Sequence, residues 1–381
     1  MKFEVKNNKL WAGISLGIMA LIMVGLSVIF LGQRTEEALF ASPAVTRQTM
    51  LSEFYPDLKG SPVDTEVFIY EGDEEGGKFL LLGGTHPPEP SGIVGAALIM
   101  QNIDVNKGTF YIIPRVNKSA LSCTEPQDGM PTGVHIETAN GTRYFRVGSR
   151  LTNPVHQWPD PDIYYHNAGQ LLTGKETRNV DRTYPGNPEG NLTERLCYGI
   201  AELIRKENID VTLDMHEGPP EYPTIDVMIT HQNAMDLAGL ASLNMALEGV
   251  DINVDASPVN LHGFSHRELG DHTQTLAILS ETVNPLQSRL CGKKNEELVI
   301  SGRDKFCEYA SANSDRLHTV YDETGKPLNL RVARNVELVR QLTIAYNELY
   351  PEKPGFDIEL PTYDDVLTNG MGAYLAYPEA N

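Results

Sequence analysis

Basic residues are scarce in this 381-residue chain, because 31 Lys and Arg stand against 51 Asp and Glu and the formal net charge at pH 7 is −20. A field of that sign repels the phosphates of nucleic acids, which excludes a nucleic-acid partner as the basis of the function. An anionic substrate is not excluded, because a local arginine or a zinc ion overrides the average charge at a site. The charge balance therefore leaves enzymes acting on small substrates open.

Cysteine is also scarce, with only Cys123, Cys197, Cys291 and Cys307 in the chain. None has the C-x-x-C spacing that is typical of zinc knuckles and thioredoxin-like motifs. Cys291 and Cys307 could pair in an oxidising compartment, and four free thiols are the alternative. The remaining composition, 41% hydrophobic and 22% charged, is typical of a globular enzyme and excludes a disordered chain.

One long uncharged hydrophobic run occupies residues 10–31. A helix rising 1.5 Å per residue spans a hydrocarbon core about 30 Å thick over such a run. Lysines precede it and two glutamates soon follow, so the positive-inside rule predicts a cytoplasmic tip over residues 1–9 and a body in the periplasm or outside the cell. We predict an uncleaved transmembrane anchor, and a protein secreted after signal cleavage is the alternative.

The rest of the chain divides into a weakly patterned segment and a long alternating one. Residues 32–62 contain scattered prolines and predict a stalk. We predict one hydrolase domain over residues 63–381. Strand-like and helix-like segments alternate there, which favours an α/β fold with a mixed central sheet flanked by helices. Strands are expected at 67–72, 78–86, 109–117, 209–218, 225–230 and 274–284, and helices at 91–102, 191–208, 235–248 and 333–351. Residues 119–188 break the alternation, and a polar stretch of that length indicates a functional loop or small elements of its own.

Two potential metal ligands follow the strand expected at 78–86. His86 and Glu89 lie in the short loop before the next helix, between a Gly-Gly pair and a glycine, with two prolines stiffening the turn. Open α/β sheets place their sites at such strand ends. Hydrolytic zinc sites commonly use two histidines and one glutamate and leave a fourth position open. The pair therefore predicts a zinc site that needs one more histidine.

Two further strand ends supply the missing groups. The apolar run at 209–218 ends in His216, where a purely structural histidine would be unusual, and Asp214 shares its face of the strand and is expected to orient an imidazole. The run at 274–284 carries Glu281, whose carboxylate is suited to take a proton from water and return it to a leaving amine. A solvated strand end is the alternative for Glu281.

With these motifs the chain resembles the succinylglutamate desuccinylase and aspartoacylase family of the zinc carboxypeptidase clan. GGTHPPEPSG is similar to that family's GGTHGNEPxG, LDMHEG to its strand-borne histidine, and LSETVNP to its glutamate-bearing strand. The resemblance extends from about Val67 to Tyr350. It implies a zinc carboxypeptidase-like fold with one Zn²⁺ held by His86, Glu89 and His216, and amide hydrolysis.

The resemblance also implies substrate-binding residues. The clan's Asp-x-Asn-Arg-x-Phe-Pro-Gly segment, whose Asn-Arg pair holds a substrate carboxylate, corresponds here to NVDRTYPG. Arg182 and Tyr184 match it, and Asp181 stands where asparagine is expected. Arg182 is suited to clamp a carboxylate in a bidentate manner, but the charge of Asp181 beside it leaves the binding of a free α-carboxylate open. An Arg–Asp surface pair is the alternative.

A further arginine is expected to polarise the scissile carbonyl. Four arginines in the long polar stretch qualify, and we take Arg150 and Arg178 as the candidates. The segment HGFSHRELGDHT adds three histidines, of which we expect His266 to contact substrate. A second metal at these histidines is the less favoured interpretation.

The sequence thus predicts a zinc-dependent hydrolase that cleaves the amide bond of an N-acyl amino acid. One alternative is a membrane-anchored metallocarboxypeptidase acting on peptides or cell-wall peptides, and another keeps the metal but cleaves an ester. The non-enzymatic alternative is an anchored binding protein. The expected partners are a small molecule or short peptide with an acyl or carboxylate group, and a membrane through the N-terminal helix.

Overall fold

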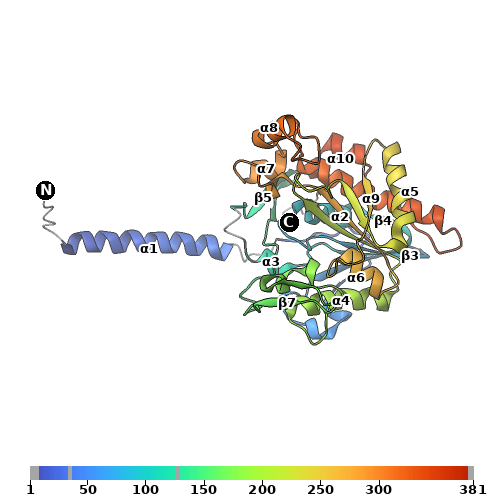
Figure 1. Cartoon of the computed structure of the whole chain (residues 1–381), viewed down its shortest axis with the longest axis horizontal. Coiled ribbons are helices and arrows are strands. Elements are labelled where there is room, and N and C mark those ends of the chain that lie inside the picture. Colours follow the sequence, from blue (N-terminus) through green and yellow to red (C-terminus); the bar gives the residue numbers. More distant parts are fainter. Residues whose placement is uncertain (1–7, 33–36, 125–128, 376–381) are drawn as a thin grey trace. The chain divides into compact units, whose positions relative to one another are not determined.

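A computed structural model describes residues 8–32, 37–124 and 129–375. The chain forms two compact units, Met1–Glu36 and Glu37–Asn381. The first contains α1 (Asn8–Gly32), which among the described residues is the only helix long and apolar enough to cross a membrane (Figure 1). The hydrophobic run at 10–31 is therefore helical. The predicted cytoplasmic tip over residues 1–9 lies almost wholly outside the described residues.

The second unit is built on a nine-stranded mixed sheet. Its order is β1-β2-β4-β3-β9-β12-β10-β11, and β13 pairs with β4 at one side. The strands β4, β3, β9 and β12 are parallel neighbours in the middle of the sheet, whereas β2 and β10 run antiparallel to β4 and β12. The strands are β1 (Arg47–Met50), β2 (Glu66–Glu71), β3 (Glu74–Leu82), β4 (Asp104–Ile113), β9 (Val211–Gly218), β10 (Val227–Thr230), β11 (Asn253–Ala256), β12 (Leu276–Val283) and β13 (Asp357–Glu359).

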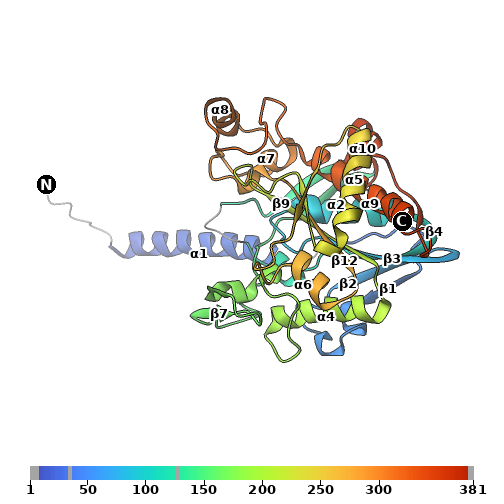
Figure 2. The same cartoon turned by 45° about the vertical axis from the view of Figure 1, so that its right-hand side comes forward.

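Helices cover both faces of this sheet. Alternate residues of β3 separate the two cores: Leu81 belongs to the cluster beneath α2, α5 and α9, and Leu80 to the cluster beneath α4 and α6. Figure 2 shows the long helix α9 on one side of the strands and α4 on the other. The helices are α2 (Pro90–Asn102), α3 (Lys118–Leu121), α4 (Leu192–Glu207), α5 (Met235–Leu247), α6 (Ser265–His272), α7 (Glu296–Ser301), α8 (Lys305–Asn313), α9 (Leu328–Leu349) and α10 (Tyr363–Asn369).

The α/β fold with a mixed central sheet flanked by helices, predicted from the alternating pattern, is confirmed. The predicted stalk over residues 32–62 differs from the structure, because most of it packs into the second unit. Leu51 and Leu58 are fully buried in two short 3₁₀ turns, η1 (Leu51–Glu53) and η2 (Pro56–Leu58), that lie against α4. Leu51 and Leu58 pack against α4, and the burial of their apolar side chains holds this segment against the second unit.

The long polar stretch at 119–188 carries small elements. Two hairpins occur there, β5 (Gly133–Thr138) with β6 (Gly141–Arg146), and β7 (Ile163–Tyr165) with β8 (Leu171–Thr173). Each forms a separate two-stranded sheet, so the stretch interrupts the alternating pattern without entering the central sheet. All four cysteines are free thiols.

Candidate metal and substrate site

A tight turn after β3 carries the first two candidate ligands. Gly84 adopts a φ of 69°, which favours glycine, and turns the chain out of the strand before His86. Glu89 lies at the N-terminal cap of α2, whose first residue is Pro90. A Cβ on Gly92 would lie 2.6 Å from the carbonyl oxygen of Met215. Only glycine therefore lets α2 approach β9 so closely next to His216.

The neighbouring strands β9 and β12 bring His216 and Glu281 together. The two residues are direct partners in a parallel pairing, so their side chains leave the sheet on the same face. His86, Glu89 and His216 are each at most 2% exposed. The residues predicted from three separate strand ends thus gather at the carboxyl edge of β3, β9 and β12, where open α/β sheets place their sites.

The carboxylate of Glu89 joins the two imidazoles. One of its oxygens lies 3.1 Å from Nδ1 of His86, and the other lies 3.1 Å from Nδ1 of His216. The far nitrogens also face oxygens: Nε2 of His86 is 2.8 Å from Oδ1 of Asn179, and Nε2 of His216 is 3.0 Å from Oδ2 of Asp214. All four ring nitrogens therefore lie within 3.1 Å of an oxygen, although Nε2 of His216 and Oδ2 of Asp214 do not meet in hydrogen-bond geometry.

This pattern fits a bound cation. A neutral imidazole has one N–H donor and one lone pair, so an acceptor at each nitrogen calls for either a second proton on the ring or a metal ion at one nitrogen. The amide of Asn179 is held with its oxygen toward His86, because its Nδ2 donates to Glu176 at 2.7 Å. A metal ion beside the two Nδ1 atoms and Glu89 would take the lone pairs and leave each Nε2–H to its oxygen partner. Two imidazoles and one carboxylate form a donor set that zinc prefers.

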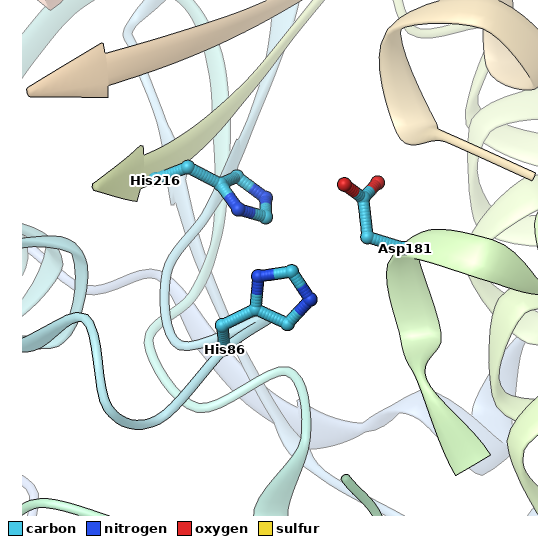
Figure 3. Close-up of side chains that lie close together, drawn as sticks. All are labelled: His86, Asp181 and His216. Carbon is cyan, nitrogen blue, oxygen red and sulfur yellow. The ribbon is translucent and has the colours of Figure 1, made fainter. Parts of the chain in front are cut away.

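Asp181 is an alternative third ligand. Together with His86 and His216 it forms a buried group whose ligand atoms lie within 4.8 Å of one another. Figure 3 shows its carboxylate beside the two imidazole rings. No hydrogen bond or ion pair joins Asp181 to either ring among the described residues, whereas Glu89 contacts both, and Asp181 instead accepts a hydrogen bond from the Ser265 amide at 2.9 Å. The geometry therefore favours Glu89 as the ligand.

The charges in this cluster depend on one another. Burial acts to raise the pKa of Glu89, but His86 and His216 hold that pKa well below its usual range. Burial acts to lower the pKa of His216, but Asp214 and Glu89 raise it well above the ordinary value. Burial, with the charge of Arg150, lowers the pKa of His86. The carboxylates therefore stabilise positive charge where a metal would bind.

Glu281 is buried next to this cluster. Burial, reinforced by the negative charge of Glu89, raises its pKa to about 8. In the part of the chain that the structure describes, its Oε2 has no hydrogen-bond partner. A buried carboxyl oxygen without a partner is costly, and such groups are characteristic of sites that move protons.

The two candidate arginines are placed differently. Arg150 donates to Oε1 of Glu89 at 3.1 Å and is about one-third exposed, so it reaches the cluster from the solvent side. Arg178 instead makes two hydrogen bonds to Asp160, at 2.7 and 2.9 Å, and a third to the carbonyl of Thr152. Of the two, only Arg150 contacts a candidate metal ligand.

The predicted substrate-binding residues line the same region but are mostly buried. Arg182 stacks 4.0 Å above the ring of Phe264, and burial lowers its pKa despite the nearby charge of Asp181. Tyr184 is fully buried, and its hydroxyl has no hydrogen-bond partner among the described residues. Burial lowers the pKa of His266 to about 3, and its Nδ1 hydrogen-bonds Ser257. Arg182 thus has the most accessible polar group of these residues.

Sequence reasoning missed several supporting residues. Asn179 holds His86, and the Gln287 amide donates to Glu89 at 3.1 Å. Glu217 accepts hydrogen bonds from the Ser91 amide and from Asn284, and it pairs with the fully buried Arg331 of α9. The position of Glu217 directly after His216 was a signal that could have been used. No feature of the sequence points to Arg331, because only the packing of α9 brings this residue to Glu217.

The sequence matches no protein-family model and no curated protein. Among solved structures, this chain is similar to a succinylglutamate desuccinylase from Silicibacter sp., with 15% identity over 59% of this chain and 55% of that chain and a TM-score of 0.37. It is also similar to the cell shape determinant protein Csd4 from Helicobacter pylori, with 14% identity over 80% and 60% and a TM-score of 0.44. An aspartoacylase family protein from Mesorhizobium loti matches with 15% identity over 64% and 66% and a TM-score of 0.36. Each match spans less than two thirds of the other chain.

Proposed function

We propose that this protein is a zinc-dependent hydrolase that cleaves an amide bond of an N-acyl amino acid. The observation that carries the proposal is the convergence of His86, Glu89 and His216 beside a buried Glu281 with an unpaired carboxyl oxygen. A purely structural cluster is expected to satisfy its polar atoms internally, whereas here the buried Oε2 of Glu281 has no hydrogen-bond partner among the described residues.

The residues of the chain divide the chemical work between them. Zinc, when bound, polarises a carbonyl and lowers the pKa of water. Glu281 takes a proton from the attacking water on one carboxyl oxygen and delivers it to the leaving amine. Arg150 donates to the carbonyl oxygen as negative charge develops there. Asn179 contacts Nε2 of His86 and Asp214 lies beside Nε2 of His216, which would leave the Nδ1 atoms of both rings available to hold a metal ion.

Two arginines favour a substrate with a negative charge. Arg150 and Arg182 both contribute positive charge near the cluster, and the charge of Arg150 acts to lower the pKa of Glu281. A guanidinium recognises a carboxylate through two parallel hydrogen bonds. An acyl amino acid with a free carboxylate would supply that partner, although Asp181 competes for Arg182 at 3.8 Å.

We further propose that α1 anchors the protein in a membrane and that the catalytic unit lies outside the cytoplasm. The helix is long and apolar enough to cross a bilayer and carries no buried residues, as expected of a helix that contacts lipid. Removal of α1 as a signal sequence is the alternative. Mass determination of the chain purified from membranes distinguishes the two, because a cleaved protein lacks residues 8–32.

The hydrolase proposal is tested with purified full-length protein in detergent and a panel of substrates at saturating zinc. The panel contains N-acyl amino acids, short peptides and matched esters, and the readout is free amine or free acid. We expect release of amine from N-acyl amino acids, suppressed by a chelator and restored by zinc. Selective cleavage of the C-terminal peptide bond would replace the deacylase assignment with a carboxypeptidase, and no hydrolysis in any arm with zinc bound would leave a binding protein.

A further inference from the structure

The hairpin formed by β7 and β8 exposes an apolar face. The register pairs Tyr165 with Leu171 and Ile163 with Thr173, so these side chains share one face. Tyr165 is 65% exposed, Leu171 61% and Ile163 46%. Tyr164, between the two outward residues of β7, is only 6% exposed, and its hydroxyl donates to Glu194. The fold therefore anchors one face of the hairpin and turns the apolar face to solvent.

Two more exposed apolar side chains precede the hairpin. Val155 is 73% exposed and Trp158 is 75% exposed. The five residues are called the hairpin patch below: Val155, Trp158, Ile163, Tyr165 and Leu171. An aromatic and aliphatic patch of this kind generally marks a contact with another apolar phase or molecule.

The place where the second unit begins indicates what covers the patch. The carbonyl of Glu37, the first residue of this unit, accepts a hydrogen bond from Arg115 at 3.0 Å. Three residues after Arg115, α3 begins, and Ser119 of α3 hydrogen-bonds His156 at 2.8 Å, beside Val155. Hydrogen bonds at Arg115 and in α3 thus lead from Glu37 to the segment that carries Val155.

The covalent connection limits how far Glu37 lies from the end of α1. The helix ends at Gly32, and the five residues from there to Glu37 span at most about 18 Å when fully extended. If α1 crosses a bilayer, the connection therefore keeps Glu37 within about that distance of the end of the membrane-spanning helix. Trp and Tyr are the side chains most enriched at the membrane–water interface, with an apolar body and a polar tip.

We propose that the hairpin patch rests in the interfacial region of the bilayer that α1 crosses. This inference rests on the proposed anchor and not on the proposed hydrolysis. The net charge of −20 disfavours anionic lipid headgroups, so apolar and aromatic contact with zwitterionic lipid provides the attraction. The contact fixes which side of the catalytic unit faces the membrane, in addition to the tether itself.

The test uses the full-length chain in nanodiscs of zwitterionic phosphatidylcholine. The chain has two tryptophans, so Trp11→Phe leaves Trp158 as the only one. Its fluorescence is compared in ordinary lipid and in lipid brominated on the acyl chains, which quenches tryptophan at short range. We expect a loss of intensity in brominated lipid and a blue-shifted maximum. Equal intensity in the two lipids overturns the proposal.

Two variants in the Trp11→Phe background decide whether the hairpin makes the contact. The first variant combines Ile163→Thr, Tyr165→Thr and Leu171→Thr. Threonine keeps the β propensity of the hairpin but removes its exposed apolar side chains, so we expect this variant to abolish the quenching of Trp158. The control is Leu243→Gln with Leu247→Gln, an exposed apolar pair on α5, which both views place away from β7 (Figures 1 and 2). We expect this control to quench like the parent.

Each other outcome contradicts the proposal. Quenching that survives the threonine variant shows that another surface contacts the lipid. Two chains per nanodisc with unquenched Trp158 assign the patch to a second copy, and a chain that lacks α1 removes the tether on which the argument depends. Hydrolysis measured in the same nanodiscs keeps this result separate from the hydrolase proposal, because retained activity without quenching overturns only the membrane contact.

Discussion

Two clusters of histidine and glutamate lie in this structure, and they satisfy their hydrogen bonds differently. In the first, both imidazoles present Nδ1 to one carboxylate and Nε2 to another side-chain oxygen. In the second, formed by His166, His262 and Glu268, the ring of His166 accepts from the Ala168 amide and donates to the Tyr184 carbonyl. His166 is therefore complete as a neutral imidazole, whereas His86 and His216 are not.

The difference shows why residue type and proximity alone do not define a metal site. Glu268 accepts hydrogen bonds from His262 and the Gly263 amide, and its other oxygen lies 3.1 Å from His272. That network closes a loop of the chain and requires no cation. The first cluster has more acceptors than two neutral imidazoles have N–H donors, so it needs added positive charge, which a second proton on His216 or a bound metal ion supplies. Substitutions in the two clusters should thus affect zinc binding very differently.

The largest expected effect is on zinc content. His216→Ala removes one of the two imidazole ligands, so we expect purified protein to fall from about one equivalent of zinc to less than half. The matched His262→Ala should keep its zinc. Elemental analysis after dialysis measures both, and zinc loss from the His262 variant alone would reverse the assignment of the two clusters.

The next largest effect is on turnover. Glu281→Gln keeps the shape of the side chain but removes the proton acceptor, so kcat should fall about 10²- to 10⁴-fold. Zinc content should stay unchanged, because Glu281 is not a proposed ligand. Steady-state kinetics with the best substrate of the panel measures the loss. A fully active Glu281→Gln enzyme would show that another group moves the proton.

The two arginines offer a smaller and more selective comparison. Arg150→Ala should lower kcat about 10²-fold, because a donor to the developing oxyanion is lost. Arg178→Ala should instead lower the melting temperature with kcat near the parent value, because its guanidinium holds Asp160 and Thr152. Kinetics and thermal unfolding are measured on both variants. If Arg178→Ala lowers kcat at unchanged melting temperature, the roles of the two arginines are exchanged.

The smallest effect is on the pH dependence of stability without metal. The pKa of Glu281 is about 8 in the folded protein, above the ordinary carboxyl value of 4.5. The stability that this group contributes is therefore fully present below about pH 4.5 and is lost as the pH rises through 8. Relative to Glu281→Gln, the melting temperature of the chelator-treated parent should fall by several degrees between pH 5 and 9. Parallel curves would show that Glu281 ionises normally.

The fold and the candidate site residues could be predicted from the sequence to different extents. Alternating segments predicted the strand ending near His86, the strand ending at His216 and the helix that begins after Asn191, because periodicity records which faces are buried. The pattern failed for Leu51 and Leu58, whose short 3₁₀ turns have too few residues to show a period. It also failed for the two hairpins between residues 119 and 188, which are separate from the main sheet.

The identities of the candidate ligands were determined by the sequence alone. A histidine at an apolar strand end is a local feature, so His86 and His216 could be proposed without coordinates, whereas Glu281 was proposed more from the family resemblance than from the local pattern. Only the tertiary structure decided that Arg150 reaches Glu89 while Arg178 binds Asp160, and that Asn179 holds His86. These contacts join residues distant in the chain, and they depend on how loops pack rather than on any local pattern. The same holds for the hairpin patch, whose exposure follows from the strand register and from the absence of a covering element among the described residues.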